Sequence, residues 1–264
     1  MDLEAEYNNR ARVPEHPAIL AAWQRDAAAW RAACPRATLG LAYGAGARER
    51  LDLFETADAA APLALFIHGG YWKALDRSFV SHCARGLNGR GVAVAVPSYD
   101  LCPSVTIGAI VEQMRACCAM LWRLRGRRIL AMGHSAGGQL AALLLATDWA
   151  SRGLPAGLVQ AALPVSGVFE LEPLLGTSIA EGLRLTPQTA RALSPRFQPS
   201  PHRPIHCVVG DAESDEYRRQ SRDMAAAWGG TFAAIPGANH FTVLAPFADP
   251  ASDVVTHAES LARG

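Results

Sequence analysis

The sequence predicts an α/β fold with a mostly parallel sheet covered by helices on both faces. Short apolar runs alternate along the chain with longer helical stretches, and this alternation is typical of such a sheet. The strand-like runs are Arg50–Phe54, Leu63–Ile67, Val92–Val96, Arg128–Met132, Val159–Val165, Ile205–Val209 and Thr231–Ile235. The helical stretches are Ile107–Leu124, Gly138–Thr147, Glu216–Trp228 and Val254–Ala262. No internal repeat or low-complexity linker interrupts the pattern, so we expect one domain over residues 1–264.

Two segments depart from this alternation. Residues 1–36 carry Leu20, Trp23, Ala27 and Trp30 at helical spacing, which predicts one amphipathic helix as an N-terminal extension. Residues 169–204 contain several prolines and short helical pieces but no clear strand. Long excursions near the carboxyl edge of a parallel sheet often cover the active site. We therefore expect residues 169–204 to act as a cap.

Composition excludes several classes of function. The 264 residues are 50% hydrophobic with a net charge of +1, which favours a packed globule and gives no reason to expect nucleic acid or an anionic membrane as partner. No apolar run approaches the ~20 residues needed to span a bilayer. The cysteines have no C-x-x-C or metal-binding spacing, which favours free thiols and a cytoplasmic location. We expect a small molecule as partner, and a homodimer is compatible with the sequence.

A candidate nucleophile, Ser135, lies in the pentapeptide Gly133-His134-Ser135-Ala136-Gly137. The pentapeptide follows a strand-like run and precedes a helical one. Glycines on either side of the serine allow a turn too tight for Cβ atoms, and the turn raises the hydroxyl at the start of a helix. A glycine-rich turn without a catalytic role has the same pattern. A phosphate cradle would need a lysine and a following serine or threonine, which are absent here.

A second loop, His68-Gly69-Gly70-Tyr71-Trp72, directly follows the strand-like run Leu63–Ile67. Acyl-transfer enzymes present backbone N–H groups to the oxyanion from a loop of this kind. Losing one such donor raises the barrier by about 3–4 kcal/mol. We predict Gly69 and Gly70 as donors, with the Ala136 amide as the third. Two such loops, each after a predicted strand, favour a catalytic role over simple turns.

His240 is the predicted general base for Ser135. It follows the strand Thr231–Ile235 and the loop 236–239, near the end of the chain, where the base is expected when the order is serine, acid, histidine. The other histidines considered fit less well: His257 lies in a late helical stretch, His134 is expected to point away from Ser135, and His202 and His206 belong to a proline-rich approach to a strand.

The acid that orients His240 is predicted in the loop after the strand Ile205–Val209. Asp211, Glu213 and Asp215 are all available there. The acid accepts the Nδ1 proton of the histidine and stabilises the imidazolium. Loops of this kind usually place the acid three residues after the glycine. This rule favours Glu213 and leaves the two aspartates open.

These motifs resemble those of the kynurenine formamidase (arylformamidase) group of α/β-hydrolases. The resemblance covers roughly residues 50–257 and includes the H-G-G-x-W loop, the serine pentapeptide, the stretch Ser214–Ser221 and Asn239-His240-Phe241. It implies an α/β-hydrolase fold and Glu213 as the acid, although eukaryotic members have aspartate there. It also implies hydrolysis of small esters or aryl formamides without metal or cofactor. The alternatives are a general short-chain carboxylesterase and, more remotely, a non-catalytic binding protein on the same fold.

An aryl formamide substrate suggests which residues shape its pocket. Tyr71 and Trp72 would narrow the pocket to suit a formyl or acetyl group, although both could equally be core residues. Formylkynurenine also carries an amino-acid head that needs polar partners. Arg184, in the 169–204 excursion, is one candidate for that contact.

Overall fold

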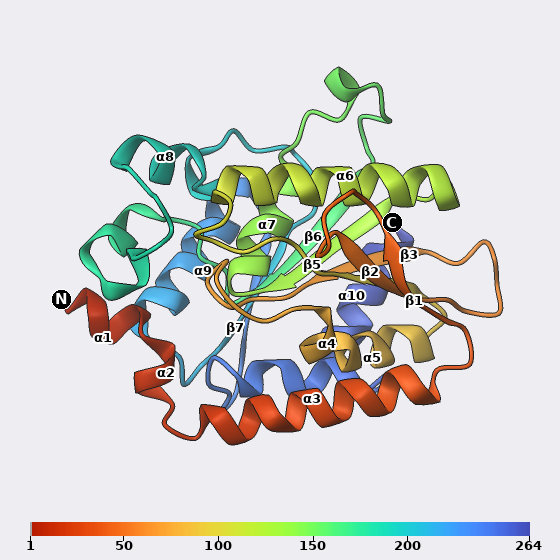
Figure 1. Ribbon diagram of the computed structural model, residues 1–264, viewed down its shortest axis with the longest axis horizontal. Helices are drawn as coiled ribbons and strands as arrows, with labels where there is room; N and C mark the ends of the chain where they lie inside the picture. The colour runs from red at the N-terminus through yellow and green to blue at the C-terminus, as the bar shows by residue number, and fades with distance from the viewer. Residues whose placement is uncertain (1) are drawn as a thin grey trace.

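The computed structural model describes residues 2–264 and is built around one eight-stranded sheet (Figure 1). The strand order is β1-β2-β4-β3-β5-β6-β7-β8. The six strands from β4 to β8 in this order are parallel to one another. Near one edge of the sheet, β2 is antiparallel to both of its neighbours, β1 and β4. The strands are β1 (Ala37–Ala42), β2 (Arg50–Phe54), β3 (Leu63–Ile67), β4 (Ala93–Pro97), β5 (Ile129–His134), β6 (Val159–Val165), β7 (His206–Gly210) and β8 (Thr231–Ile235). The predicted mostly parallel sheet is confirmed.

Helices cover both faces of the sheet. In Figure 1, α6 and α7 lie above it, and α3, α4, α5 and α10 lie below it. The helices are α1 (Leu3–Tyr7), α2 (Asn9–Arg12), α3 (His16–Ala33), α4 (Arg77–Val80), α5 (Ala84–Gly89), α6 (Ile107–Arg125), α7 (Ala136–Leu145), α8 (Pro187–Ala192), α9 (Asp215–Trp228) and α10 (Asp253–Arg263). None of the helices within residues 2–264 is both long and apolar enough to cross a bilayer.

The central strand β3 explains why the sheet needs two helical layers. Leu63, Leu65 and Ile67 belong to the core under α6 and α7, whereas Ala64 and Phe66 belong to the core on the opposite face. Successive side chains of a strand point to opposite faces, so a strand buried on both sides is apolar throughout. The continuous apolar runs in the sequence therefore mark the strands at the centre of the sheet.

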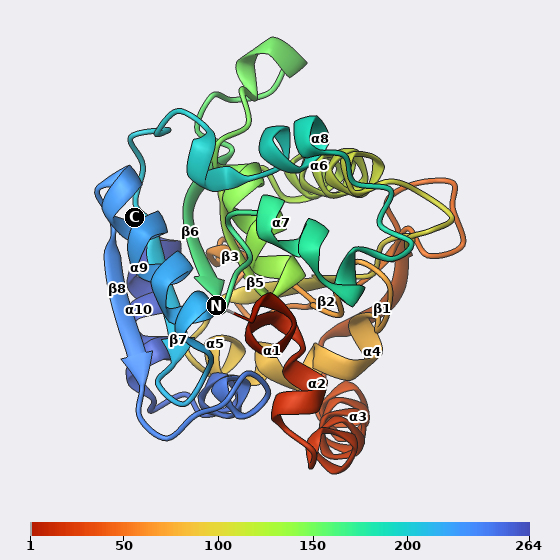
Figure 2. The ribbon, with the colours of Figure 1, turned by 90° about the vertical axis from the view of Figure 1, so that its left-hand side faces the viewer.

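The predicted amphipathic helix of the N-terminal segment is α3, and two short helices that were not predicted, α1 and α2, precede it. Asn8 ends α1 and starts α2, because its side-chain oxygen accepts a hydrogen bond from the Ala11 amide. The predicted amphipathic face belongs to α3 alone, where Trp23 and Ala27 are buried. Figure 2 shows the three as distinct helices, with α2 between α1 and α3.

Residues 169–204 contain no strand, as predicted. They form the 3-10 helices η3 (Glu172–Gly176), η4 (Ser178–Ala180) and η5 (Pro195–Phe197) around α8. The segment is joined to α1, because the amide and hydroxyl of Ser178 donate to the Glu4 carboxylate at 2.8 and 2.7 Å. The N-terminal helices and this excursion therefore meet on one side of the molecule (Figure 2).

Candidate active site

Ser135 lies at a sharp turn between β5 and α7. Its backbone angles, φ 55° and ψ −119°, are strained for a residue with a side chain, and its amide donates to the Val165 carbonyl at 2.8 Å. A Cβ atom on Gly137 would lie 2.1 Å from the Ile67 carbonyl oxygen, and one on Gly133 would lie 2.3 Å from the Gly137 oxygen. The glycines therefore permit close packing, while the unusual dihedral angles belong to the serine itself.

His240 and Glu213 form a buried, directly bonded pair. His240 Nδ1 lies 2.6 Å from Glu213 Oε2. The other carboxylate oxygen accepts bonds from the Ser166 hydroxyl and, at 2.7 Å, from the Gly210 amide. A carboxylate held by several hydrogen-bond donors keeps its position. The structure thus fixes the acid on both oxygens and orients the imidazole.

The two alternative acids lie elsewhere. Asp211 is exposed, and its carboxylate accepts from the Gly237 amide at 2.6 Å. Asp215 is also exposed and pairs with Arg218 one turn along α9. Of the three candidates in this loop, the structure brings Glu213 to His240.

His134 lies against His240, although the sequence suggested that it points away from the site. Its Nε2 is 2.8 Å from the His240 carbonyl oxygen, and the two ring centres are 4.7 Å apart. Burial lowers the pKa of His134 well below its usual value, so the ring is neutral. A neutral His134 can donate from Nε2 and so hold the backbone of the histidine loop.

The other three histidines considered in the sequence lie outside the cavity that holds Ser135. His206 and His257 stack on each other with ring centres 3.9 Å apart, and His202 is exposed. None of these three lines the cavity that holds Ser135.

Residues 68–72, here called the oxyanion loop after the role predicted for it, are held in place by contacts with Tyr99. The Tyr99 ring stacks on the His68 ring at 4.1 Å, and the Tyr99 hydroxyl donates to the His68 carbonyl at 3.0 Å. The His68 ring lies 2.8 Å from the Gly69 carbonyl through Nδ1. Burial lowers the pKa of His68 to about 4, so its ring is neutral.

The oxyanion loop packs directly on the serine turn. A Cβ atom on Gly69 would lie 2.9 Å from Ser135 Cβ. Within residues 2–264, the amides of Gly69, Gly70 and Ala136 have no hydrogen-bond acceptor. Unpaired amides beside the serine leave donors available for a ligand.

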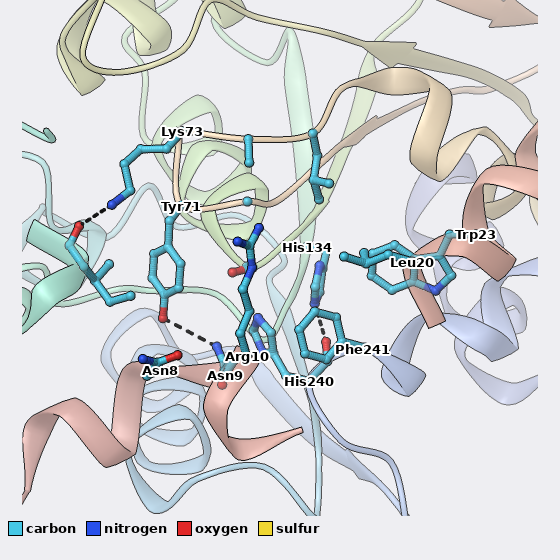
Figure 3. Close-up of a pocket in the computed structure, with 15 residues that line it drawn as sticks. Asn8, Asn9, Arg10, Leu20, Trp23, Tyr71, Lys73, His134, His240 and Phe241 are labelled. Atoms are coloured by element: carbon cyan, nitrogen blue, oxygen red, sulfur yellow. Dashed lines mark hydrogen bonds between the residues drawn. The ribbon is translucent and has the colours of Figure 1, made fainter. Parts of the chain in front are cut away.

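Ser135 and His240 line a cavity of about 260 Å³ (Figure 3). Its walls come from the oxyanion loop, the two N-terminal helices α2 and α3, and the excursion. The lining residues are Asn8, Asn9, Arg10, Leu20, Trp23, Gly70, Tyr71, Lys73, Ala74, Leu75, His134, Ser135, Ile179, His240 and Phe241. The contribution of the N-terminal segment to this cavity was not predicted from the sequence. Only the Asn8 cap gave a local signal that the segment has a fixed fold there.

Tyr71 lies at the centre of a hydrogen-bonded group that joins the N-terminus to the site. Its hydroxyl contacts the Tyr7 carbonyl at 2.5 Å and the Tyr217 hydroxyl at 2.6 Å. The Tyr217 ring in turn lies 4.6 Å from the His240 ring. Burial raises the pKa of Tyr71 well above its usual value, so its hydroxyl stays protonated.

Trp72 and Arg184 do not line the cavity. Trp72 is fully buried, and its indole nitrogen donates to the Gln139 side chain at 3.3 Å, so it supports the loop from the core. Arg184 is exposed on the excursion and is not among the residues that line the cavity. The cation that lines the cavity from the N-terminal segment is Arg10.

Residues 64–229 match the profile of the α/β-hydrolase fold family. The chain belongs to the α/β-hydrolase family. This hydrolase is 30% identical over 227 residues to the kynurenine formamidase of Salmo salar, which covers 80% of this chain and 77% of the relative. It is 28% identical over 234 residues to the kynurenine formamidase of Drosophila melanogaster, covering 81% and 78% of the two chains. The resemblance inferred from the motifs is confirmed.

Solved structures agree on the fold. A crystal structure from Silicibacter sp., provisionally assigned as a thioesterase, superposes with a TM-score of 0.90 at 34% identity and covers 97% of this chain and 98% of the other. The carboxylesterase EstE1 from a metagenomic library gives a TM-score of 0.75 at 19% identity, covering 94% and 95% of the two chains. The fold of the hydrolase is therefore shared with these structures over nearly the whole chain.

Proposed function

We propose that this hydrolase cleaves small esters or aryl formamides by two-step acyl transfer, with aryl formamides as the favoured class. Ser135 attacks the carbonyl carbon, and His240 accepts its proton. Glu213 stabilises the imidazolium that forms, through the 2.6 Å bond to Nδ1. General-base assistance of this kind contributes roughly 10²–10⁴-fold to the rate.

The oxyanion that forms would be bound by the Gly69, Gly70 and Ala136 amides. A peptide bond is trans, so its C=O and N–H point in opposite directions. Tyr99 holds the His68 carbonyl and the His68 ring holds the Gly69 carbonyl on one side. The Gly69 and Gly70 N–H groups therefore point to the other side of the oxyanion loop. Gly70 lines the cavity that holds Ser135, which supports the assignment.

Release of the amine completes the first step. An aniline is a poor leaving group unless it is protonated, and His240 carries the proton taken from Ser135. Water then repeats the sequence on the formyl-enzyme ester, with His240 as base, and releases formate. These steps need no metal or cofactor.

The size and the lining of the cavity support aryl formamides as the favoured substrate class. Ser135 and His240 open into only about 260 Å³, flanked by the aromatic side chains of Trp23, Tyr71 and Phe241. A small cavity with mostly apolar, partly aromatic walls fits an aromatic ring and a one-carbon acyl group better than a long acyl chain. The kynurenine formamidases among its relatives act on a substrate of that kind by name.

The test compares kcat/KM for N-formyl-L-kynurenine and p-nitrophenyl acetate on one preparation, with Ser135→Ala as the control. We expect formamide turnover at or above ester turnover and loss of both in the variant. Ester turnover with negligible formamide cleavage would make the enzyme a general short-chain carboxylesterase. Full activity of Ser135→Ala would overturn the mechanism.

A further inference from the structure

The cavity beside Ser135 carries positive charge without a compensating carboxylate. Its lining includes two cationic residues, Arg10 and Lys73, and neither aspartate nor glutamate. The Lys73 ammonium is already engaged, because it donates to the carbonyls of Ile179 and Glu181 at 2.9 and 3.0 Å. Arg10 is therefore the cation that remains available to a ligand.

Arg10 has no partner within the part of the chain that the structure describes. Among residues 2–264, no carboxylate lies within 4.0 Å of its guanidinium, and its side chain is exposed. Figure 3 shows the side chain extending from α2 into the cavity, between Tyr71 and His134. A planar guanidinium with several free donors matches the geometry of a carboxylate, which it can bind through two parallel hydrogen bonds.

The helix that carries Arg10 is held in place by its neighbours in sequence. The Tyr7 carbonyl accepts the Tyr71 hydroxyl, and the Asn8 side chain caps α2. Asn9 is 3% exposed and contacts the Tyr71 hydroxyl at 3.4 Å. These contacts fix the helical turn that carries Arg10, and the fold therefore determines how its side chain enters the cavity. Arg12, two residues further on the same helix, is exposed and does not line the cavity.

We propose that Arg10 binds a carboxylate of the substrate and thereby selects aryl formamides or esters that carry an acidic group away from the bond that is cleaved. The inference rests on the proposed function of the same site. The carboxylate is not part of the reacting group, so the contact is equal in the ground and transition states. Its loss should therefore raise KM and leave kcat nearly unchanged.

The test uses Arg10→Gln, with Arg12→Gln as the matched control. The substrates are N-formyl-L-kynurenine and 2-formamidoacetophenone, which share the aryl formamide but differ in the carboxylate-bearing side chain. For Arg10→Gln we expect kcat/KM on formylkynurenine to fall about tenfold or more, through KM, because a charge-assisted hydrogen bond is lost. Turnover of 2-formamidoacetophenone, and both activities of Arg12→Gln, should stay within about twofold.

A binding measurement separates this inference from the proposed function. L-Kynurenine and 2-aminoacetophenone, which need not be cleaved, are titrated into the Ser135→Ala protein with and without Arg10→Gln. We expect only the affinity for L-kynurenine to fall about tenfold. Equal losses for both ligands would indicate that Arg10 merely supports α2. The proposal is overturned if Arg10→Gln lowers the affinity for both ligands equally or lowers neither affinity. It is also overturned if the Ser135→Ala protein does not prefer L-kynurenine over 2-aminoacetophenone. These outcomes hold whether or not the enzyme cleaves formamides.

Discussion

Replacing Glu213 with glutamine separates the charge of the proposed triad acid from its shape. The glutamine carbonyl can still accept from the Ser166 hydroxyl and the Gly210 amide, as Oε1 does in the structure. Its NH₂ group would then face His240 Nδ1, which lies 2.6 Å from Oε2. An amide NH₂ only donates, so Nδ1 has to accept, and the imidazole proton moves to Nε2. In that tautomer His240 cannot take the proton of Ser135.

The expected magnitude follows from the tautomer. Holding the histidine in the wrong tautomer lowers kcat by about 10⁴-fold in a serine hydrolase, which corresponds to roughly 5 kcal/mol of barrier. Stability should change little, because both buried donors keep an acceptor and no cavity is created. Glu213→Gln should therefore be a folded protein with very low activity.

The assay is p-nitrophenyl acetate hydrolysis by Glu213→Gln, with Asp211→Asn and Asp215→Asn as controls from the same loop. Both controls should retain activity within about threefold, because their carboxylates bond to the Gly237 amide and to an exposed arginine. The reasoning is refuted if Glu213→Gln keeps kcat within tenfold of the parent enzyme. It is also refuted if Asp211→Asn loses as much activity as Glu213→Gln.

Three further predictions concern the oxyanion loop and the buried histidine His82. Gly69→Ala places a methyl group 2.9 Å from Ser135 Cβ, so the loop must move, and kcat should fall about 10²-fold or more with an unchanged circular dichroism spectrum. Tyr99→Phe releases the carbonyls of the oxyanion loop and should lower kcat about three- to tenfold, whereas Tyr43→Phe, whose hydroxyl bonds elsewhere, should not. Burial lowers the pKa of His82 to about 4, so the unfolded chain binds its proton first as pH falls from 6.5. The contribution of His82 to the free energy of unfolding should be full above pH 6.5 and decrease by about 3 kcal/mol towards pH 4, in addition to the contributions of other buried histidines such as His68. In urea titrations His82→Phe should lose that part of the pH dependence, and an unchanged dependence would contradict the assignment.

The centre of the fold was predictable because its strands are buried on both faces. The runs Leu63–Ile67 and Val159–Val165 match β3 and β6 residue for residue. The edge strand β1 was missed because most of its residues are exposed or half-buried, and Gly40 lies at a register shift with φ 71°. The other edge strand, β8, was predicted because four of its five residues are apolar, whereas Thr38 and Gly40 interrupt the apolar run in β1.

The reactive residues were predictable, and the cavity around them was not. Ser135 directly follows β5 and His240 follows β8 after the loop 236–239, so their place at the carboxyl edge of the sheet follows from local pattern. Arg10 and Trp23 reach the cavity through contacts between segments more than a hundred residues apart in sequence. No local pattern marks such residues, since their role depends on how the N-terminal helices pack over the oxyanion loop.

The most direct test of the account is to locate the nucleophile covalently. The enzyme is incubated with a fluorophosphonate, in which the serine oxygen attacks phosphorus, fluoride leaves and His240 takes the hydroxyl proton. Peptide mapping by mass spectrometry should find one adduct, on Ser135, formed in step with loss of activity and absent from Ser135→Ala. An adduct on another residue that removes the activity, or full activity of the enzyme labelled on Ser135, would contradict the account.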